Sequence, residues 1–492
     1  MLFNSPEFLL FLPIVFALYW FVVQRNLRVQ NLLLVLASYV FYGWWDWRFL
    51  GLIAFSTVVD YLVGLQIEEA QEKRIKKQWL GVSLVVNLGL LCYFKYSNFF
   101  IDSWVDAWAA AGVTMHVSSL QVILPVGISF YTFQTLSYSI DIYRGNLKPT
   151  RSFINFAAFV SFFPQLVAGP IERASRLLPQ IENKRVFKYE EGVAGLRLIL
   201  WGMFKKVVVA DTCAIYANDI FANYTEYSGP TLMLGAVYFA FQIYGDFSGY
   251  SDIAIGTAKL FGIQLMTNFK TPYFSRDIAE FWRRWHISLS TWFRDYLYIP
   301  LGGSRVGKWK SVRNVFIIFL VSGFWHGANW TFIVWGGIHA ALFLPLLLRG
   351  TNRRYTSDTI GEGRWLPTGR EFLGMAWTFS MVCVAWVFFR AESVGEALSY
   401  LKSFGSNLTL HQFTSEINSV GAGFSVLRGK YLFTLICITL IAENFFDQIN
   451  SIIFKIKIVH PLVIYFMTLI SVWLIIEFAL RNNVVDFIYF QF

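Results

Sequence analysis

Residues 314–348 read NVFIIFLVSGFWHGANWTFIVWGGIHAALFLPLLL, a run that contains no Asp, Glu, Lys or Arg. About 20 apolar residues already suffice for a helix to cross the hydrocarbon core of a bilayer. A single crossing here would place the arginines that follow, from Arg349 to Arg370, on the outer side, against the rule that basic loops face the cytoplasm. We therefore expect either that the run doubles back at its glycine-rich middle or that the charge rule fails locally.

The rest of the chain has the same apolar character. Of the 492 residues, 56% are hydrophobic, 19% are aromatic and only 15% are charged, whereas a soluble domain carries about 25% charged residues. Soluble chains of this length also divide into domains with polar seams between them, because single cores stop growing at roughly 250–300 residues. The composition predicts a polytopic membrane protein.

We predict an all-α fold with about eleven membrane-spanning helices, from the length and spacing of the apolar runs. The candidate spans are residues 7–23, 30–46, 49–66, 79–97, 120–143, 192–222, 231–258, 314–348, 370–390, 431–449 and 460–480. The apolar patch 152–170 lies between basic flanks, which favours a re-entrant or interfacial segment. Such irregular backbone is tolerated at membrane depth only where protein buries it or where it lines a cavity.

The formal net charge is +10, and the stretch 259–313 holds ten Lys and Arg against three acidic residues. In a soluble protein this excess would suggest nucleic acid, but no nucleic-acid motif accompanies it. Basic loops that face anionic membrane lipids explain it better, so we expect lipid partners and no nucleic acid. The charge pattern predicts that segment 144–190 is cytoplasmic and that segment 391–428 faces outward.

His326 lies inside the opening run, between Gly323 and Gly327. An ionisable residue at membrane depth is costly and by default suggests a function. The two glycines have the spacing that lets helices pack closely, and they would also let a ligand approach the backbone. The alternative is a core histidine that bonds a neighbouring carbonyl group.

His286 ends the sequence Phe281-Trp-Arg-Arg-Trp-His. Trp, Arg and Tyr at this density are typical of a membrane interface, so lipid anchoring is one interpretation. The other is a cytoplasmic opening in which Arg283 and Arg284 bind an anionic, phosphate-bearing acyl donor. On one helix, Trp282 and His286 would share a face.

Three further ionisable residues stand in apolar surroundings. His339 follows His326 by thirteen positions, which on a continuous helix turns it roughly 220° away and favours a packing role. Asp246 and Asp252 need partners at membrane depth. They could form a proton path, orient a histidine or pair with an arginine, and we favour a structural role.

Common catalytic signatures are missing from the sequence: no Walker A motif, GxSxG, HExxH or strand-associated GxGxxG occurs. We expect no metal and no bound cofactor. Neutral imidazole is a good general base near pH 7, which favours an enzyme. A proton-coupled transporter or a polysaccharide or lipid flippase could use the same His and Asp residues as a relay, although the lack of internal repeats weakens that alternative.

Seven motifs in order along the chain resemble the membrane-bound O-acyltransferases, and within them the bacterial alginate O-acetylase branch. The motifs are Leu124-Pro-Val-Gly-Ile-Ser-Phe-Tyr-Thr-Phe-Gln134, Phe163-Pro-Gln-Leu-Val-Ala-Gly-Pro-Ile171, Gly245-Asp-Phe-Ser-Gly-Tyr-Ser-Asp252, Asn268-Phe-Lys-Thr-Pro-Tyr273, Phe281-Trp-Arg-Arg-Trp-His286, Tyr298-Ile-Pro-Leu-Gly-Gly-Ser304 and Gly323-Phe-Trp-His-Gly-Ala-Asn-Trp330.

The resemblance implies a single membrane domain over 1–492, with helices around a central tunnel. Its sections would be N-terminal helices 1–143, a catalytic core 144–348 and C-terminal helices 349–492. It implies multi-pass location in a bacterial inner membrane and acetyl transfer from cytoplasmic acetyl-CoA. A periplasmic SGNH-type acetyltransferase partner would then acetylate an exopolysaccharide such as alginate, and the outward 391–428 loop would suit partner docking.

The resemblance also implies that His326 is the catalytic histidine and His286 the second hallmark histidine. Trp282, Arg283 and Arg284 would line the donor side, while Trp325 and Asn329 would orient His326 or the thioester carbonyl. A general base and a covalent acyl-histidine remain alternatives, as does an alanyl donor on a carrier protein. The acceptor glycan and the oligomeric state stay open.

Overall fold

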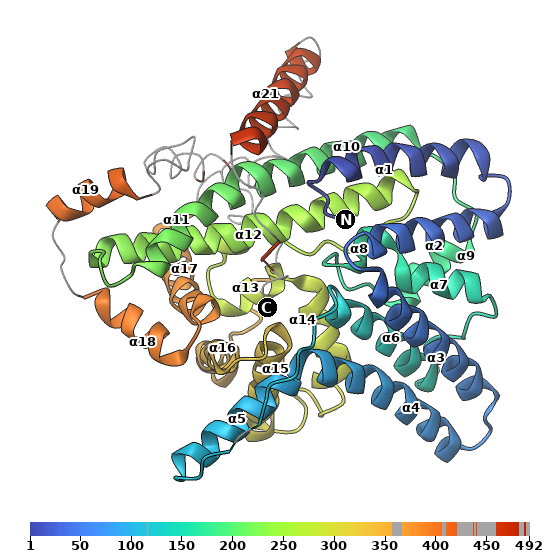
Figure 1. The fold of residues 1–492 in the computed structure, drawn as a ribbon, viewed down its shortest axis with the longest axis horizontal. Helices are drawn as coiled ribbons and strands as arrows, with labels where there is room; N and C mark the ends of the chain where they lie inside the picture. The colour runs from blue at the N-terminus through green and yellow to red at the C-terminus, as the bar shows by residue number, and fades with distance from the viewer. Residues whose placement is uncertain are drawn as a thin grey trace. The chain divides into compact units, whose positions relative to one another are not determined.

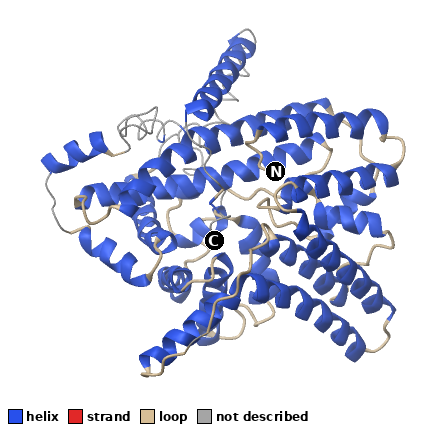
Figure 2. Ribbon diagram, viewed as in Figure 1, coloured by secondary structure: helices blue, strands red, loops and turns tan. Residues whose placement is uncertain are grey.

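The computed structural model describes residues 1–115, 117–356, 367–405, 410–420, 436, 439, 459–481, 487 and 488. Within these ranges every regular element is a helix and no strand occurs (Figure 2), which confirms the all-α prediction there. Helices long and apolar enough to cross a membrane cover Trp47–Glu69, Lys73–Ala110, Trp330–Leu348 and Gly369–Arg390. The predicted count of about eleven spans is not confirmed, and the predicted span 431–449 lies, apart from 436 and 439, outside the described residues.

The chain divides into two compact units. The first contains Met1–Ile199 and Ser251–Met266, and the second contains Leu200–Tyr250 and Thr267–Phe492. Every residue that the sequence marks as a candidate for catalysis or donor binding belongs to the second unit. The predicted single domain with its three sections stays a prediction.

The first unit consists of successive helices. These are α1 (Pro6–Ala17), α2 (Leu27–Gly43), α3 (Leu50–Glu69), α4 (Lys73–Leu91), α5 (Ser97–Ala110), α6 (Ile128–Tyr143), α7 (Phe153–Ser161), α8 (Phe163–Leu166) and α9 (Ala174–Glu182) (Figure 1). The patch predicted to be re-entrant forms the short helices α7 and α8, and every residue from Phe156 to Glu172 is buried. Protein therefore covers this irregular backbone, as its predicted depth requires.

A buried polar cluster joins α3, α4 and α6. The carboxylate of Asp60 accepts hydrogen bonds from the Asn87 amide at 2.7 Å and from the Ser139 hydroxyl at 3.0 Å, as well as from the Ser83 hydroxyl. All four side chains are buried. Because a buried carboxylate is costly unless donors surround it, this cluster fixes how the three apolar helices pack.

The second unit contains the remaining helices, while α10 (Tyr189–Met203) and α12 (Gly229–Leu260) contribute residues to both units. The elements that lie wholly in the second unit include the π-helix η4 (Phe204–Ala210), α11 (Asp211–Ala222), α13 (Ile278–Arg284), α14 (Ile287–Phe293), α15 (Lys308–His326), α16 (Trp330–Leu348), α17 (Gly369–Arg390), α18 (Val394–Ser403), α19 (Leu410–Ser419) and α21 (Val459–Arg481). Figure 1 shows α15 and α16 beside each other.

The apolar run 314–348 doubles back after His326. This confirms one of the two alternatives that the sequence analysis left open. Helix α15 ends at His326, and α16 begins at Trp330 after Asn329, whose side-chain oxygen accepts the Thr331 amide at 3.0 Å. Glycines let the two helices touch: a Cβ atom on Gly336 would overlap the Phe319 carbonyl oxygen. The hairpin returns the chain, so Arg349, at the C-terminal end of α16, lies at the same end of the hairpin as the basic start of α15.

A second close approach joins η4 to α12. A Cβ atom on Gly249 would lie 2.7 Å from the Gly202 carbonyl oxygen. At this crossing the buried Lys206 ammonium pairs with Asp211 at 2.8 Å and with Asp246 at 2.9 Å. Asp246 therefore pairs with a lysine, and not with the arginine that the sequence analysis left as one of three alternatives.

We predict that Gly336→Ala lowers the thermal stability of the purified protein in detergent, whereas Gly337→Ala does not. The first methyl group would collide with the Phe319 carbonyl, and overpacking of this kind costs about 1–3 kcal/mol. A Cβ atom on the neighbouring Gly337 would lie 3.8 Å from Cδ2 of Leu320, which is ordinary contact. Alanine also has a higher helix propensity than glycine. Equal melting temperatures for the two variants would contradict the close packing of α15 on α16.

Candidate active site

The two histidines singled out by the sequence lie next to each other in the second unit. The imidazole centroids of His286 and His326 are 6.2 Å apart, with the ring planes inclined by 57°. Both side chains are buried, with 0% and 3% of their surface exposed. His326 is the last residue of α15, and His286 lies between α13 and α14. Residues that are distant in the sequence thus form one pair.

His286 adopts an unusual backbone conformation. Helix α13 ends at Arg284, Trp285 is extended, and His286 has a φ of 44° before α14 begins. A non-glycine residue with positive φ is uncommon and costs free energy. The expectation that Trp282 and His286 share a face of one helix is therefore wrong, because the helix stops between them.

Asn268 fixes the orientation of the His286 ring. Its side-chain oxygen accepts hydrogen bonds from the Ser288 amide at 3.2 Å and from the Ser288 hydroxyl at 2.9 Å, and it lies 3.1 Å from Nδ1 of His286. Because a carbonyl oxygen only accepts, Nδ1 of the neutral ring must carry the hydrogen. The lone pair is then on Nε2, which is buried and has no protein hydrogen-bond partner among the described residues.

Burial also sets the protonation state of His286. It lowers the pKa of this imidazole from about 6.5 to about 3, because a charged ring would lose its hydration. The ring is therefore neutral near pH 7. A neutral imidazole with a fixed Nδ1–H and an open lone pair on Nε2 can accept a proton or a hydrogen bond from a ligand.

Aromatic side chains surround the histidine pair. The Phe247 ring meets His286 edge-on at a centroid distance of 4.7 Å. Around His326, Trp325 lies at 4.9 Å, Trp335 at 5.2 Å and Phe389 at 5.5 Å. These rings are almost fully buried. They keep bulk water away from the two imidazoles and strengthen electrostatic interactions between them and a bound group.

A third histidine joins the same cluster. Trp335 contacts His326 on one side and His339 on the other, at 5.2 Å and 4.8 Å. Nδ1 of His339 accepts the indole N–H of Trp282 at 3.3 Å. The expectation that His339 points away from His326 assumed a continuous helix and is wrong, because the chain reverses between them. His339 is buried among aromatic rings, as a packing residue would be.

The two predicted donor-binding arginines bond to protein groups. Arg283 donates to the carbonyl oxygens of Asn352 at 2.9 Å and Tyr355 at 2.6 Å. Arg284 pairs with Glu280 at 2.9 Å and is nearly buried. Both arginines thus hold α13 in place, and their contact with a donor stays a prediction.

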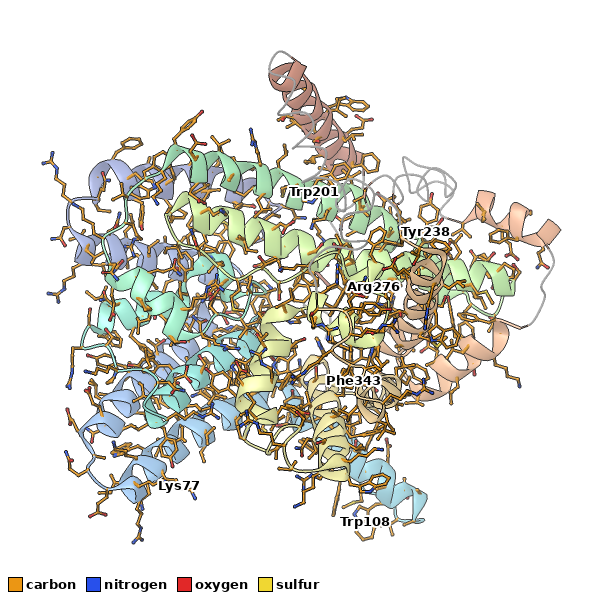
Figure 3. The ribbon with its side chains drawn as sticks, turned by 180° about the vertical axis from the view of Figure 1, so that it is seen from behind. Lys77, Trp108, Trp201, Tyr238, Arg276 and Phe343 are labelled. Carbon is orange, nitrogen blue, oxygen red and sulfur yellow. The ribbon has the colours of Figure 1, made fainter. Side chains whose placement is uncertain are left out.

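The sequence analysis missed the ionic support beneath this helix. Glu280, which is buried, also pairs with Arg276 at 2.8 Å, and Arg276 reaches Glu371 on α17 at 3.2 Å. Arg276, which is labelled in Figure 3, lies just before the start of α13 at Ile278. The sequence signal for this ionic group is weak. Arg276 and Glu280 lie within the basic stretch 259–313, and Glu371 is far from them in the sequence.

Two further predicted residues fall on either side of His326. The Trp325 ring packs against both His326 and His286, with a centroid distance of 6.0 Å to the latter. Asn329 caps α16 and donates to the Glu392 carbonyl at 2.9 Å. Trp325 therefore contacts both histidines, whereas Asn329 holds the hairpin turn that follows it, and an orienting role for either residue stays a prediction. In the described part of the chain no group of three or more His, Cys, Asp or Glu residues is placed to hold a metal ion.

Comparison with known proteins places both histidines inside one family. Residues 146–383 match the sequence profile described as MBOAT, membrane-bound O-acyltransferase family. The probable alginate O-acetylase AlgI of Pseudomonas syringae pv. tomato is 44% identical over 413 residues, which cover 82% of this chain and 76% of that protein. The peptidoglycan O-acetyltransferase of Helicobacter pylori is 39% identical over 432 residues, or 82% and 79% of the two chains. The teichoic acid D-alanyltransferase of Bacillus subtilis is 29% identical over 289 residues, or 54% and 69%.

The pKa of His286 predicts a pH-dependent contribution to stability. Between about pH 3 and pH 6.5 the unfolded chain binds a proton at this residue that the folded chain does not bind, so stability is lost as the pH falls through this window. His286→Gln removes this titration. We therefore expect the melting temperature of the wild type, relative to that of His286→Gln, to fall between pH 7.5 and pH 5. A difference that stays constant over this range would show that His286 is not held neutral.

Proposed function

The chain belongs to the membrane-bound O-acyltransferase family, and on that premise we propose that it transfers an acetyl group from cytoplasmic acetyl-CoA towards an exopolysaccharide outside a bacterial inner membrane. That it is a membrane-bound acyltransferase follows from the family, from its O-acetyltransferase relatives and from its apolar helices. Family membership favours the enzyme over the transporter or flippase that the sequence left as an alternative.

The observation that carries this proposal is the pair of buried imidazoles 6.2 Å apart. This spacing leaves each ring within reach of one small group placed between them. An acceptor hydroxyl and a thioester carbonyl are such groups, and a general base must lie within hydrogen-bond reach of the proton that it removes. The aromatic enclosure supplies the dry environment that favours transfer to the acceptor over hydrolysis.

In the proposed reaction a ring nitrogen of His326 takes the proton of the acceptor hydroxyl. The hydroxyl oxygen then attacks the carbonyl carbon of acetyl-CoA and forms a tetrahedral intermediate. As the C–S bond breaks, the sulfur leaves with its electron pair and receives the proton from His326, so the products are an O-acetyl ester and free CoA. A positioned base of this kind contributes about 10²–10⁴-fold to the rate.

His286 would position the reacting groups opposite His326. Its Nε2 is the atom that Asn268 leaves with a lone pair, so it can accept a hydrogen bond from a second donor group of the bound acceptor, while the reacting hydroxyl donates to His326. Trp325, which contacts both rings, would complete the wall of the site. An acyl group carried covalently on a histidine is the alternative mechanism.

The nature of donor and acceptor is proposed from the relatives. Their names specify alginate and peptidoglycan as acetylated polymers, which supports an acetyl donor and a polysaccharide acceptor. That a periplasmic SGNH-type partner completes the transfer is part of the proposal and has no support from these names. The segment 391–428 is our candidate for docking that partner, although its residues 406–409 and 421–428 lie outside the part of the chain that the structure describes. A D-alanyltransferase among the more distant relatives keeps an alanyl group on a carrier protein as the second donor to test.

The test is release of free CoA thiol from acetyl-CoA by purified protein, with candidate glycan and partner added. We expect His326→Ala to lower the rate by at least about 10²-fold without loss of folded protein. His460→Ala, which changes a histidine on α21, serves as the matched control and should retain the wild-type rate.

Three outcomes decide the proposal. Thiol release that depends on His326 supports an acetyl-CoA-dependent transferase. Release that survives His326→Ala overturns the assignment of the base. No release by well-folded wild type under these conditions overturns acetyl-CoA as donor and directs the work to an alanyl carrier protein.

A further inference from the structure

The two described residues near the C-terminus are buried against α12. Phe487 and Ile488 expose only 3% and 1% of their surface. The Phe487 ring packs on Tyr250 at a centroid distance of 4.8 Å and on Phe247 at 6.1 Å. They lie beyond residues 146–383, which match the family profile, so nothing in that match assigns them a role.

The backbone at this point is anchored by a charge. The amide of Ile488 donates a hydrogen bond of 2.6 Å to Oδ2 of Asp246, and the other carboxylate oxygen pairs with Lys206 at 2.9 Å. Lys206 also pairs with Asp211 at 2.8 Å. All three charged side chains are buried. A buried ionic group that is tied to three elements is costly to disrupt, so the segment is fixed to a rigid point of α12.

The next residue of α12 connects this anchor to the active site. Phe247 follows Asp246 directly and contacts both Phe487 and His286, with centroid distances of 6.1 Å and 4.7 Å. Its ring is fully buried. Phe247 therefore connects the C-terminal segment to the site histidine through direct ring contacts.

We propose that Phe487 and Ile488 form a C-terminal clamp that positions His286 through Phe247 for acyl transfer. The proposal rests on the proposed function, since it assigns a positioning role within the same site. The amide of Ile488 fixes the segment on Asp246, and the ring of Phe487 packs against Phe247.

The conformation of His286 explains why such support matters. The residue has a φ of 44°, and Asn268 holds only one edge of its ring, at Nδ1. Ring packing holds the rest, and Phe247 at 4.7 Å is nearer to the His286 ring than Trp325 at 6.0 Å. Closely packed side chains keep the catalytic groups in their positions. A displacement of such a group by about 1 Å can lower the rate about 10²-fold.

The test compares Phe487→Ala with Phe478→Ala. Phe478, on α21, is also a phenylalanine with 3% exposure in the same unit, so both changes remove the same buried ring from the C-terminal part of the chain. At equal amounts of folded protein, we expect Phe487→Ala to lower kcat about 10–100-fold with KM for acetyl-CoA within about twofold. Phe478→Ala should keep kcat within about threefold of the wild type.

A second measurement does not depend on activity. Amide hydrogen exchange of the segment 281–290, which contains His286, should become faster in Phe487→Ala than in Phe478→Ala. For the anchor, Ile488→Pro removes the N–H that Asp246 accepts, whereas Ile488→Ala keeps it. We expect the proline variant alone to reproduce both effects of Phe487→Ala.

The outcomes separate this proposal from the proposed function. Equal effects of Phe487→Ala and Phe478→Ala on kcat and exchange would show general loosening and overturn the clamp. Unchanged exchange and kcat in Phe487→Ala would overturn it as well. An inactive wild type would count against the acetyl-CoA proposal, and the exchange experiment would still decide whether the clamp holds His286.

Discussion

The hydrogen bond between Asn268 and His286 is the constraint on which the rest of the site depends. Asn268 also binds the amide and hydroxyl of Ser288, so it holds both sides of the turn in which His286 has its positive φ. The bond assigns the hydrogen to Nδ1 and leaves the lone pair on Nε2. Burial keeps the ring neutral. One amide therefore sets the orientation, tautomer and chemical capacity of the imidazole that lies opposite His326.

The helical hairpin supplies the other half of the site. Because the chain reverses between α15 and α16, His326 ends one helix while Trp335 and His339 lie on the next, and the three rings pack in sequence. The glycines at the crossing allow the backbones to touch. The ionic group formed by Arg276, Glu280 and Arg284 then holds α13, from which the chain continues to His286. Packing and charge act together to bring two distant motifs to one point.

The sequence predicted those parts of the protein that depend on local pattern. The length and spacing of the apolar runs predicted helices, the cost of an ionisable residue among apolar neighbours selected His326, and the basic, aromatic sequence around His286 selected that histidine. Sequence patterns could not predict which side chains come together where a helix ends and the chain changes direction. The stop after Arg284 and the turn at Asn329 separate Trp282 from His286 and bring His339 towards His326, because capping and tertiary contacts outweigh continuous periodicity. Asn268 stood in a quoted motif, but no local signal shows that it would bind an imidazole eighteen residues away.

The most direct test of the account is a structure of the protein with a non-hydrolysable thioether analogue of acetyl-CoA. The account predicts that the carbonyl group of the analogue lies between the two imidazoles, with a hydroxyl group or water that could attack it roughly 2.6–3.2 Å from a ring nitrogen of His326. It also predicts that the hydrogen bond from Asn268 to His286 persists in that complex. An analogue bound with its carbonyl group out of reach of both rings would contradict the claim that this pair of histidines carries out acyl transfer.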